Sequence, residues 1–243
     1  IPGKESKTYT FDTLDAKDFF KDAEFFGTDI VVLTEFSKIV NFSKNWYFSY
    51  LDTIGQKIWE DSAQIDTFFQ SLYLLSKDKK EILRHKRKWD SFEAGQSFLT
   101  PEDTRNMWSI LSFAVDGGIY ILKQDLSIIK AYSSPKYRLE KLIINKLPKN
   151  YTIEKNQNDI ELKTRQDLSY VYLYLNEKIW ILRPNSKNYS DTKTLTYIWQ
   201  IEGRKFKIKD FYVAKDGEIM ILNSDGIYRL TFEVDKDDKL IVR

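Results

Sequence analysis

Short apolar segments rich in Ile, Leu, Val and aromatic residues alternate with polar turns along the chain. One motif, with Ile or Leu followed by a bulky residue, an aliphatic residue and Leu, occurs five times: DIVVL (29–33), SLYLL (71–75), GIYIL (118–122), KIWIL (178–182) and EIMIL (218–222). Its second residues, at positions 30, 72, 119, 179 and 219, are 42, 47, 60 and 40 residues apart. Such short β-branched and aromatic runs are typical of strands. The pattern therefore predicts an all-β chain of five repeated units with one long insertion.

Each motif lies between two further strand-like segments. Those upstream are DAEFFG (22–27), IDTFFQ (65–70), SILSFAV (109–115), SYVYLYL (169–175) and DFYVA (210–214). Those downstream are KIVNF (38–42), EILRH (81–85), SIIKAY (127–132), TLTYIW (194–199) and GIYRLTF (226–232), and WYFSYL (46–51) and RLEKLIIN (138–145) add a weaker fourth segment to two units. The middle segments are almost continuously apolar, whereas the outer ones alternate, which predicts middle strands that are buried on both faces.

Three or four strands in about 40 to 50 residues resemble the blade of a β-propeller. The resemblance implies five four-stranded blades in one domain, with units near 17–52, 60–97, 105–148, 165–205 and 206–243. If part of the chain is missing from this sequence, the five units would form most of a six- or seven-bladed ring. A Trp-Asp dipeptide is absent from the matching positions of the units, so no family function is carried over.

The beginning of the chain has two further predicted features. LDAKDFFKDAEFF (14–26) has apolar residues near helical spacing and predicts a short helix before the first blade, although its second half also fits a strand. We expect KTYTF (7–11) to pair beside KLIVR (239–243) and close the ring, because an open ring exposes two sheet edges. The alternatives to a propeller are a β-sandwich, two small β domains or an α+β fold.

Composition excludes several classes of function. The 243 residues include 38 basic and 36 acidic side chains, a net charge of +2, so no overall field favours nucleic acid. The absence of cysteine removes disulfides, thiol nucleophiles and cysteine-based metal sites. The one histidine, His85, excludes sites that need two imidazoles. His85 lies in RHKRK (84–88), which we expect to be a solvated strand end, with its basic side chains divided between the two faces of a strand.

The apolar segments are too short to span a membrane. The longest, such as WSILSFAV (108–115), fall well below the ~20 residues that a membrane helix needs. This length predicts that the part of the protein given by this sequence is soluble. The chain begins with Ile1 instead of Met. The sequence therefore leaves open whether a signal or an anchor helix precedes it, and with it the compartment, including an extracytoplasmic or membrane-anchored one.

Sites for chemistry are weakly indicated. A glycoside hydrolase on this fold would need two carboxylates about 5 to 10 Å apart in the central channel. Asp29, Asp116 and Asp216 are candidates by position, but they fall where hairpin turns favour Asp. The oxygen-rich segments DKDD (235–238) and NSDG (223–226) are interpreted as turns instead of calcium loops. No phosphate-binding glycine motif occurs, and no cofactor is predicted.

The loops of a propeller are its usual binding surface. Aromatic and Arg residues are enriched at protein interfaces, and the candidate contacts here are Phe36, Trp59, Trp108, Arg183 and Tyr189. The insertion RPNSKNYSDTK (183–193) is expected to shape this face. These features predict a non-enzymatic binding or scaffold module for a protein partner. The alternatives are a carbohydrate-binding propeller and a glycoside hydrolase.

Overall fold

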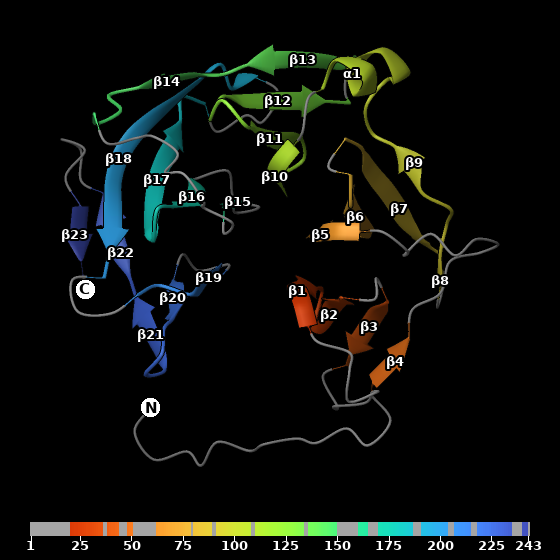
Figure 1. Ribbon diagram of the computed structural model, residues 1–243, viewed down its shortest axis with the longest axis horizontal. Coiled ribbons are helices and arrows are strands. Elements are labelled where there is room, and N and C mark those ends of the chain that lie inside the picture. Colours follow the sequence, from red (N-terminus) through yellow and green to blue (C-terminus); the bar gives the residue numbers. More distant parts are fainter. Residues whose placement is uncertain are drawn as a thin grey trace.

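A computed structural model describes residues 20–35, 38–43, 48–50, 62–78, 80–88, 91–107, 110–133, 136–149, 160–164, 170–186, 191–203, 207–214, 218–234 and 240–242. Within these residues, five small sheets stand around a central space, each with its first strand nearest the middle (Figure 1). The predicted all-β, five-bladed β-propeller is therefore confirmed.

The first three blades are antiparallel sheets in chain order. Blade 1 contains β1 (Phe20–Phe26), β2 (Asp29–Thr34), β3 (Ile39–Phe42) and β4 (Phe48–Tyr50). Blade 2 contains β5 (Ser62–Phe68), β6 (Ser71–Ser76), β7 (Ile82–Lys88), β8 (Ser91–Phe92) and β9 (Gln96–Ser97), and both short strands pair with β7. Blade 3 contains β10 (Ile110–Val115), β11 (Ile119–Lys123), β12 (Ile128–Tyr132) and β13 (Arg138–Lys141).

Blade 4 explains the long spacing between the third and fourth motifs. Its strands are β15 (Glu161–Thr164), β16 (Val171–Leu175), β17 (Lys178–Pro184), β18 (Thr194–Glu202) and an outer strand, β14 (Ile143–Asn145), parallel to β18. The segment SYVYLYL thus supplies the second strand, and the first strand is β15, within the insertion. RLEKLIIN divides between the edges of blades 3 and 4, as β13 and β14.

Blade 5 has the fewest strands of the five blades within the described residues. It contains β19 (Asp210–Val213), β20 (Ile219–Leu222) and β21 (Ile227–Leu230), and a hairpin of β22 (Phe232–Val234) and β23 (Leu240–Val242) follows it. β1 and β19 are the inner strands on either side of the junction between the first and last blades (Figure 1). The predicted closing strand at 7–11 lies outside the described residues, as does the predicted helix up to residue 19; the rest of that helical stretch, from Phe20, is β1.

The middle strands are buried on both faces, as their sequences predict, because apolar side chains pack between consecutive blades. β16 is buried along its whole length, and β6 and β11 are buried except at their last residues. Separate core clusters join blades 1 and 2, blades 2 and 3, blades 3 and 4, and blades 4 and 5. Trp180 is the largest fully buried side chain of the described core and lies between blades 3 and 4.

A one-turn helix, α1 (Pro101–Asn106), occupies the junction between blades 2 and 3. Thr100 caps it by accepting a hydrogen bond from the backbone N–H of Asp103, and Pro101 stands in the first turn. This combination favours a helix start. The described residues include no helix that is long and apolar enough to cross a membrane.

The expectation for His85 is wrong. Its side chain is fully buried in β7, and its Nδ1 atom lies 3.0 Å from the carbonyl oxygen of Glu93. The backbone of Gly95 approaches the ring so closely that a Cβ atom there would lie 2.6 Å from it. Only the last three residues of the basic run, Lys86 to Lys88, are exposed. Burial disfavours the charged form of the ring and therefore lowers the pKa of His85.

Candidate functional site: the central cavity

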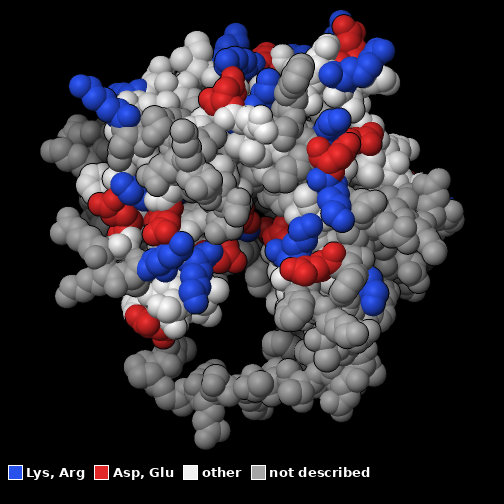
Figure 2. Space-filling model, in the orientation of Figure 1, with Lys and Arg blue, Asp and Glu red and all other residues white. Residues whose placement is uncertain are grey.

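The inner strands of the five blades enclose a cavity of about 670 Å³ along the axis of the propeller. Its polar lining comes from β1, β5, β15 and the chain at β19, and Leu111 of β10 adds an apolar side chain. Figure 2 shows acidic and basic side chains intermingled around a hollow near the middle of this face. The charged lining residues are Lys21, Asp22, Glu24, Glu161, Lys163, Lys209 and Asp210.

Two carboxylates at the inner strands tie neighbouring blades together. Asp22 accepts hydrogen bonds from the backbone N–H of Ala23, at 2.9 Å, and of Ile65 in blade 2, at 2.8 Å. Asp66, on the inner strand of blade 2, accepts from Thr67 at 2.6 Å and from Val115 in blade 3 at 2.7 Å. Asp22 and Asp66 therefore have the same structural role: each accepts a hydrogen bond from a backbone N–H group of the next blade.

A side-chain hydrogen bond to a backbone N–H group also joins blade 3 to blade 4. The Ser112 hydroxyl accepts from the backbone N–H of Leu162 at 2.8 Å and donates to Gln64 at 2.9 Å. Gln64 also exchanges hydrogen bonds with the backbone of Phe113. Side chains of the inner strands thus join blades 2, 3 and 4 in one hydrogen-bonded series.

Lys163 links blade 4 to blade 1 across the cavity. Its Nζ atom lies 2.7 Å from Oε1 of Glu161 and 3.1 Å from Oε1 of Glu24. These two carboxylate oxygens are therefore no farther apart than the sum of the two distances, 5.8 Å. The Lys163, Glu24 and Glu161 side chains are 12%, 16% and 22% exposed, so the group is in contact with the cavity and is not sealed.

The carboxyl groups have raised pKa values. Burial raises the pKa of Asp22 to about 6 and that of Glu161 to about 7, against the opposing effect of Lys163. Burial also raises the pKa of Glu24 and, well above its usual value, that of Asp66. Carboxylates nearby add to these shifts because like charges oppose ionisation.

The pKa of Lys163 moves in the opposite direction from that of a lone buried lysine. Burial disfavours its charged form, but the combined charges of Glu161, Glu24 and Asp22 outweigh that effect and raise its pKa well above the usual value. Lys163 is therefore charged at every physiological pH, whereas Asp22 and Glu161 exchange protons near neutrality.

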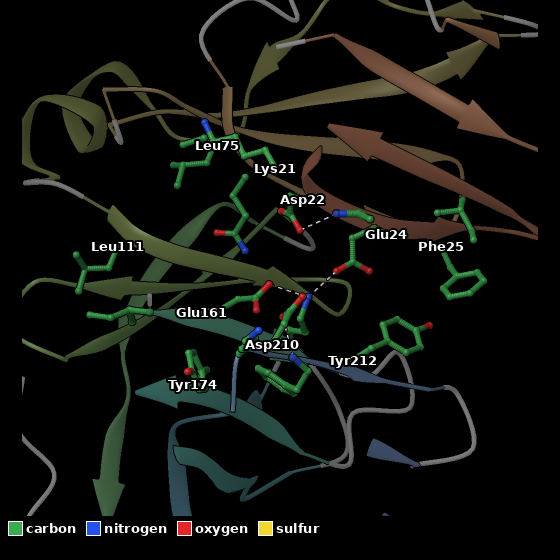
Figure 3. A pocket seen from close by; sticks show the side chains of 18 residues that line it. Lys21, Asp22, Glu24, Phe25, Leu75, Leu111, Glu161, Tyr174, Asp210 and Tyr212 are labelled. Carbon is green, nitrogen blue, oxygen red and sulfur yellow. Dashed lines mark hydrogen bonds and ion pairs between the residues drawn. The ribbon is translucent and has the colours of Figure 1, made fainter. Parts of the chain in front are cut away.

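Aromatic rings share the cavity with the charged groups. Phe25, Tyr174, Phe211 and Tyr212 line it, and the rings of Phe25 and Tyr212 lie 5.2 Å apart, from blades 1 and 5. Figure 3 shows the carboxyl groups of Glu24 and Glu161 directed toward a common point, with Phe25 and Tyr212 to one side. A cavity with rings at one side and hydrogen-bonding groups at the other suits a small ligand that has both apolar and polar surfaces.

Metal binding gains no support from the geometry. In the part of the chain that the structure describes, no three His, Asp or Glu side chains are arranged to hold an ion. Of the two oxygen-rich segments, NSDG forms the predicted turn, in which the Asn223 side chain accepts from the backbone N–H groups of Asp225 and Gly226. DKDD lies outside the described residues.

Of the five candidate contacts for a partner, the structure describes only Arg183. Phe36, Trp59, Trp108 and Tyr189 lie outside the described residues. Arg183 is in β17, half-buried, and pairs with Thr196 of β18. The role of these five residues therefore stays a prediction.

Of the Asp candidates at the hairpins, Asp29 and Asp116 are not in the cavity lining. Asp29 begins β2, and Asp116 is buried at the β10–β11 turn, where it pairs with Lys130; Asp216 lies outside the described residues. The acids that do line the cavity were missed, although their spacing carries a signal. Asp22 and Glu24, and likewise Glu161 and Lys163, are two residues apart, which puts each pair on one face of its strand.

Comparisons with known proteins show the fold. No protein-family model matches the chain, and no curated protein matches its sequence. Among solved structures, a chain of the nidogen/laminin complex is 9% identical with a TM-score of 0.58, and the match covers 88% of this chain and 76% of that one. The β-propeller domain of Cps50 (Swd1) from Myceliophthora thermophila is 7% identical with a TM-score of 0.53, covering 87% and 68%.

An enzyme name also occurs among these similar structures. A putative 6-phosphogluconolactonase from Bacteroides uniformis is 14% identical with a TM-score of 0.53, and the match covers 89% of this chain and 67% of that one. The similar structures thus include both a protein complex and a putative enzyme, so the function of this chain has to be argued from its site.

Proposed function

We propose that this protein is a binding propeller whose central cavity takes a small, neutral, polyhydroxylated molecule such as a saccharide. One observation carries the proposal: carboxyl groups, an ammonium group and aromatic rings from different blades face one cavity of about 670 Å³. That volume lies within the range of small-molecule sites, roughly 300 to 1,000 Å³.

The charge of the lining favours a neutral ligand. Three lysines and four carboxyl groups line the cavity, so their formal charges nearly cancel. Protonation of Glu161 near pH 7 brings the balance closer to zero. A site with little net charge attracts anions and cations less strongly than a cleft that is lined by charges of one sign.

The hydrogen-bonding capacity of the lining matches hydroxyl groups. A protonated carboxyl group donates and accepts, an ionised one only accepts, and an ammonium group only donates. Glu161 and Asp22 have pKa values of about 7 and about 6, so both carboxyl forms are present near neutrality. Hydroxyl groups both donate and accept, and the apolar face of a sugar ring can pack on Phe25 or Tyr212.

The same geometry argues against hydrolysis. The Glu24 and Glu161 oxygens are at most 5.8 Å apart, a bound that allows the separation of about 5 to 5.5 Å between the carboxyl groups of a retaining glycosidase. However, Lys163 lies between them and pairs with both. The ammonium group occupies the position that the reacting bond would need, so these carboxyl groups can hold a sugar but are not arranged to cleave it.

A glycan array with the intact chain tests this proposal. Variants Asp210→Ala and Tyr212→Ala remove one acceptor and one ring from the lining, and we expect each to weaken the tightest glycan about tenfold, on the order of one hydrogen bond to a charged group. Asp225→Ala and Tyr228→Ala are matched controls, since both lie in blade 5 and neither lines the cavity. These controls should keep the wild-type affinity.

Two results would overturn the proposal. Failure of every glycan to bind, or equal loss of binding in lining and control variants, contradicts a saccharide site in the cavity. Release of reducing ends from the bound glycan, with a bell-shaped pH dependence that Glu161→Gln abolishes, would establish the hydrolase alternative instead.

A protein partner remains the other prediction from the sequence. It was based on the face that carries Phe36, Trp59, Trp108, Arg183 and Tyr189. Replacing 183–193 by a short Asn-Gly turn tests the role of that insertion, because unchanged partner binding would exclude it. A different surface gives more specific support for a protein partner.

A further inference from the structure

The hairpin turns between the first and second strands of the blades can be compared within the molecule. At positive φ, blade 1 has Gly27 and blade 3 has Gly117. Gly and Asn are the residues that adopt this conformation most easily. Blade 2 has Phe69 at the same place, with φ of 50°.

Phe69 is unfavourable at this position in two independent ways. A bulky side chain at positive φ is strained. The ring is also 77% exposed, with an edge-to-face contact to Phe68 at 4.5 Å. Because folding alone favours Gly or Asn here, the exposed ring needs an explanation outside the stability of the hairpin.

A second cavity adjoins this ring. It has a volume of about 420 Å³ and is lined by Phe26, Gly27, Phe69, Gln70 and Arg87. The space above Gly27 is open, since a Cβ atom there would meet nothing within 4 Å. The surface therefore combines an exposed aromatic ring with room beside it for an apolar side chain.

Positive charge surrounds the same place. The Arg87 guanidinium lies 5.3 Å from the centre of the Phe26 ring, and the Arg87 backbone N–H donates to the Gln70 carbonyl at 2.8 Å. Lys86, Arg87 and Lys88 are all exposed at the end of β7. The hairpin bond holds this basic strand end next to Phe69.

We propose that this surface, formed by Phe26, Gly27, Phe69, Gln70 and Arg87, docks an acidic segment of a partner protein that carries a large apolar side chain. The apolar side chain covers Phe69 and enters the cavity beside Gly27, and an acidic side chain pairs with Arg87. Aromatic and Arg residues are the most frequent anchors of protein interfaces. This inference is independent of the proposed saccharide site, because the two cavities have no lining residue in common.

The chemistry favours a protein segment over a nucleic acid. Successive residues of a strand point to opposite faces, so Arg87 faces one way while Lys86 and Lys88 face the other. This arrangement gives no continuous track for a phosphate backbone. One cation beside one exposed ring and a cavity suits a carboxylate next to an apolar side chain.

Selection of displayed peptides tests the proposal. A random library of peptides of about 12 residues is selected against the immobilised wild-type protein, with counter-selection against Phe69→Asn. We expect the enriched peptides to contain Asp or Glu next to a large apolar residue. Their affinities are then measured by fluorescence anisotropy of labelled synthetic copies.

Two variants and their controls locate the contact. Phe69→Asn removes the ring and places a residue that tolerates positive φ in the turn, so its midpoint of thermal unfolding should be unchanged or higher while affinity falls about thirtyfold. Arg87→Glu should weaken binding about tenfold. Tyr228→Asn and Lys141→Glu, at an exposed ring and an exposed cation on other blades, should leave affinity unchanged.

Other outcomes overturn the proposal. They are enrichment of peptides without acidic residues, absence of enrichment over the Phe69→Asn counter-target, and unchanged affinity of Phe69→Asn. Equal or tighter binding of a labelled single-stranded oligonucleotide that depends on Lys86 to Lys88 would assign the surface to nucleic acid instead.

Discussion

Two buried lysines of this propeller have opposite surroundings. Lys130 is fully buried in blade 3, and its Nζ atom donates to Asp116 at 3.1 Å and to the Tyr120 hydroxyl at 2.8 Å. The Lys130 and Asp116 side chains are 0% and 1% exposed. Lys163 instead contacts the central cavity and has two carboxylate partners.

The directions of the pKa shifts follow from this difference. Burial lowers the pKa of Lys130 and raises that of Asp116, as expected for one matched pair away from water. At Lys163 the surplus of carboxylates reverses the effect of burial and raises the pKa. The charges of Lys130 and Asp116 are paired with each other away from the cavity. The additional carboxyl groups around Lys163 face an open cavity, where they retain hydrogen-bonding capacity for a ligand.

Lys130→Met should have the largest effect on stability. The substitution leaves Asp116 buried without its cation, and breaking a buried pair in this way costs about 3 to 5 kcal/mol of unfolding free energy. Urea denaturation at pH 7 measures it. The double variant Lys130→Met/Asp116→Leu should recover most of the loss, and Lys141→Met, at an exposed lysine of β13, should change stability by less than about 0.5 kcal/mol.

A loss for the double variant as large as that for Lys130→Met would contradict the description of a self-contained pair. It would mean that the cost comes from the packing of the Lys130 side chain and not from an unpaired charge.

Lys163→Met should have a smaller, pH-dependent effect. Without the ammonium group, the folded-state pKa values of Glu24 and Glu161 rise further above their unfolded values, so the two groups stay protonated at pH 5 and oppose folding as pH rises. We expect a loss that is about 2 to 3 kcal/mol greater at pH 8 than at pH 5. Urea denaturation at both pH values checks this, and a loss independent of pH would contradict it.

Glu161→Gln should give the smallest of these effects. The folded-state pKa of Glu161, about 7, is above its usual value, so this group contributes most to stability at low pH and loses that contribution as pH rises through 7. The unfolding free energy of the wild type minus that of Glu161→Gln should therefore fall by about 1 to 2 kcal/mol between pH 6 and pH 8. Denaturation curves at intervals across this range measure the difference, and a rise with pH would show that Lys163 lowers the pKa instead.

Much of the fold follows from the apolar pattern. GIYIL and SLYLL are continuous apolar runs because both faces of β11 and β6 are covered by neighbouring blades. The pattern could not place β15, since ELKT is short and polar and becomes an inner strand only through its contacts with β10 and β16. The helix α1 was missed, although Thr100 and Pro101 are common helix-start residues.

The site was harder to predict than the fold. Asp22 with Glu24, and Glu161 with Lys163, have the two-residue spacing of a single strand face, but the sequence analysis missed both pairs, because sequence alone does not tell which face points to the axis. Lys130 shows the same limit, because a polar residue in SIIKAY is expected to face solvent and is instead fully buried beside Asp116. Phe69 was recognised only as part of an apolar segment, since its positive φ and its exposure are properties of the folded hairpin.

The central claim is that the open cluster around Lys163 is a binding site and the sealed pair at Lys130 is not. A crystal structure of the protein soaked with the glycan that binds it most tightly tests this claim directly. The account predicts sugar hydroxyls within hydrogen-bond distance of Glu161 or Asp210 and a sugar ring against Phe25 or Tyr212. A glycan bound elsewhere, with only water in the central cavity, would contradict it.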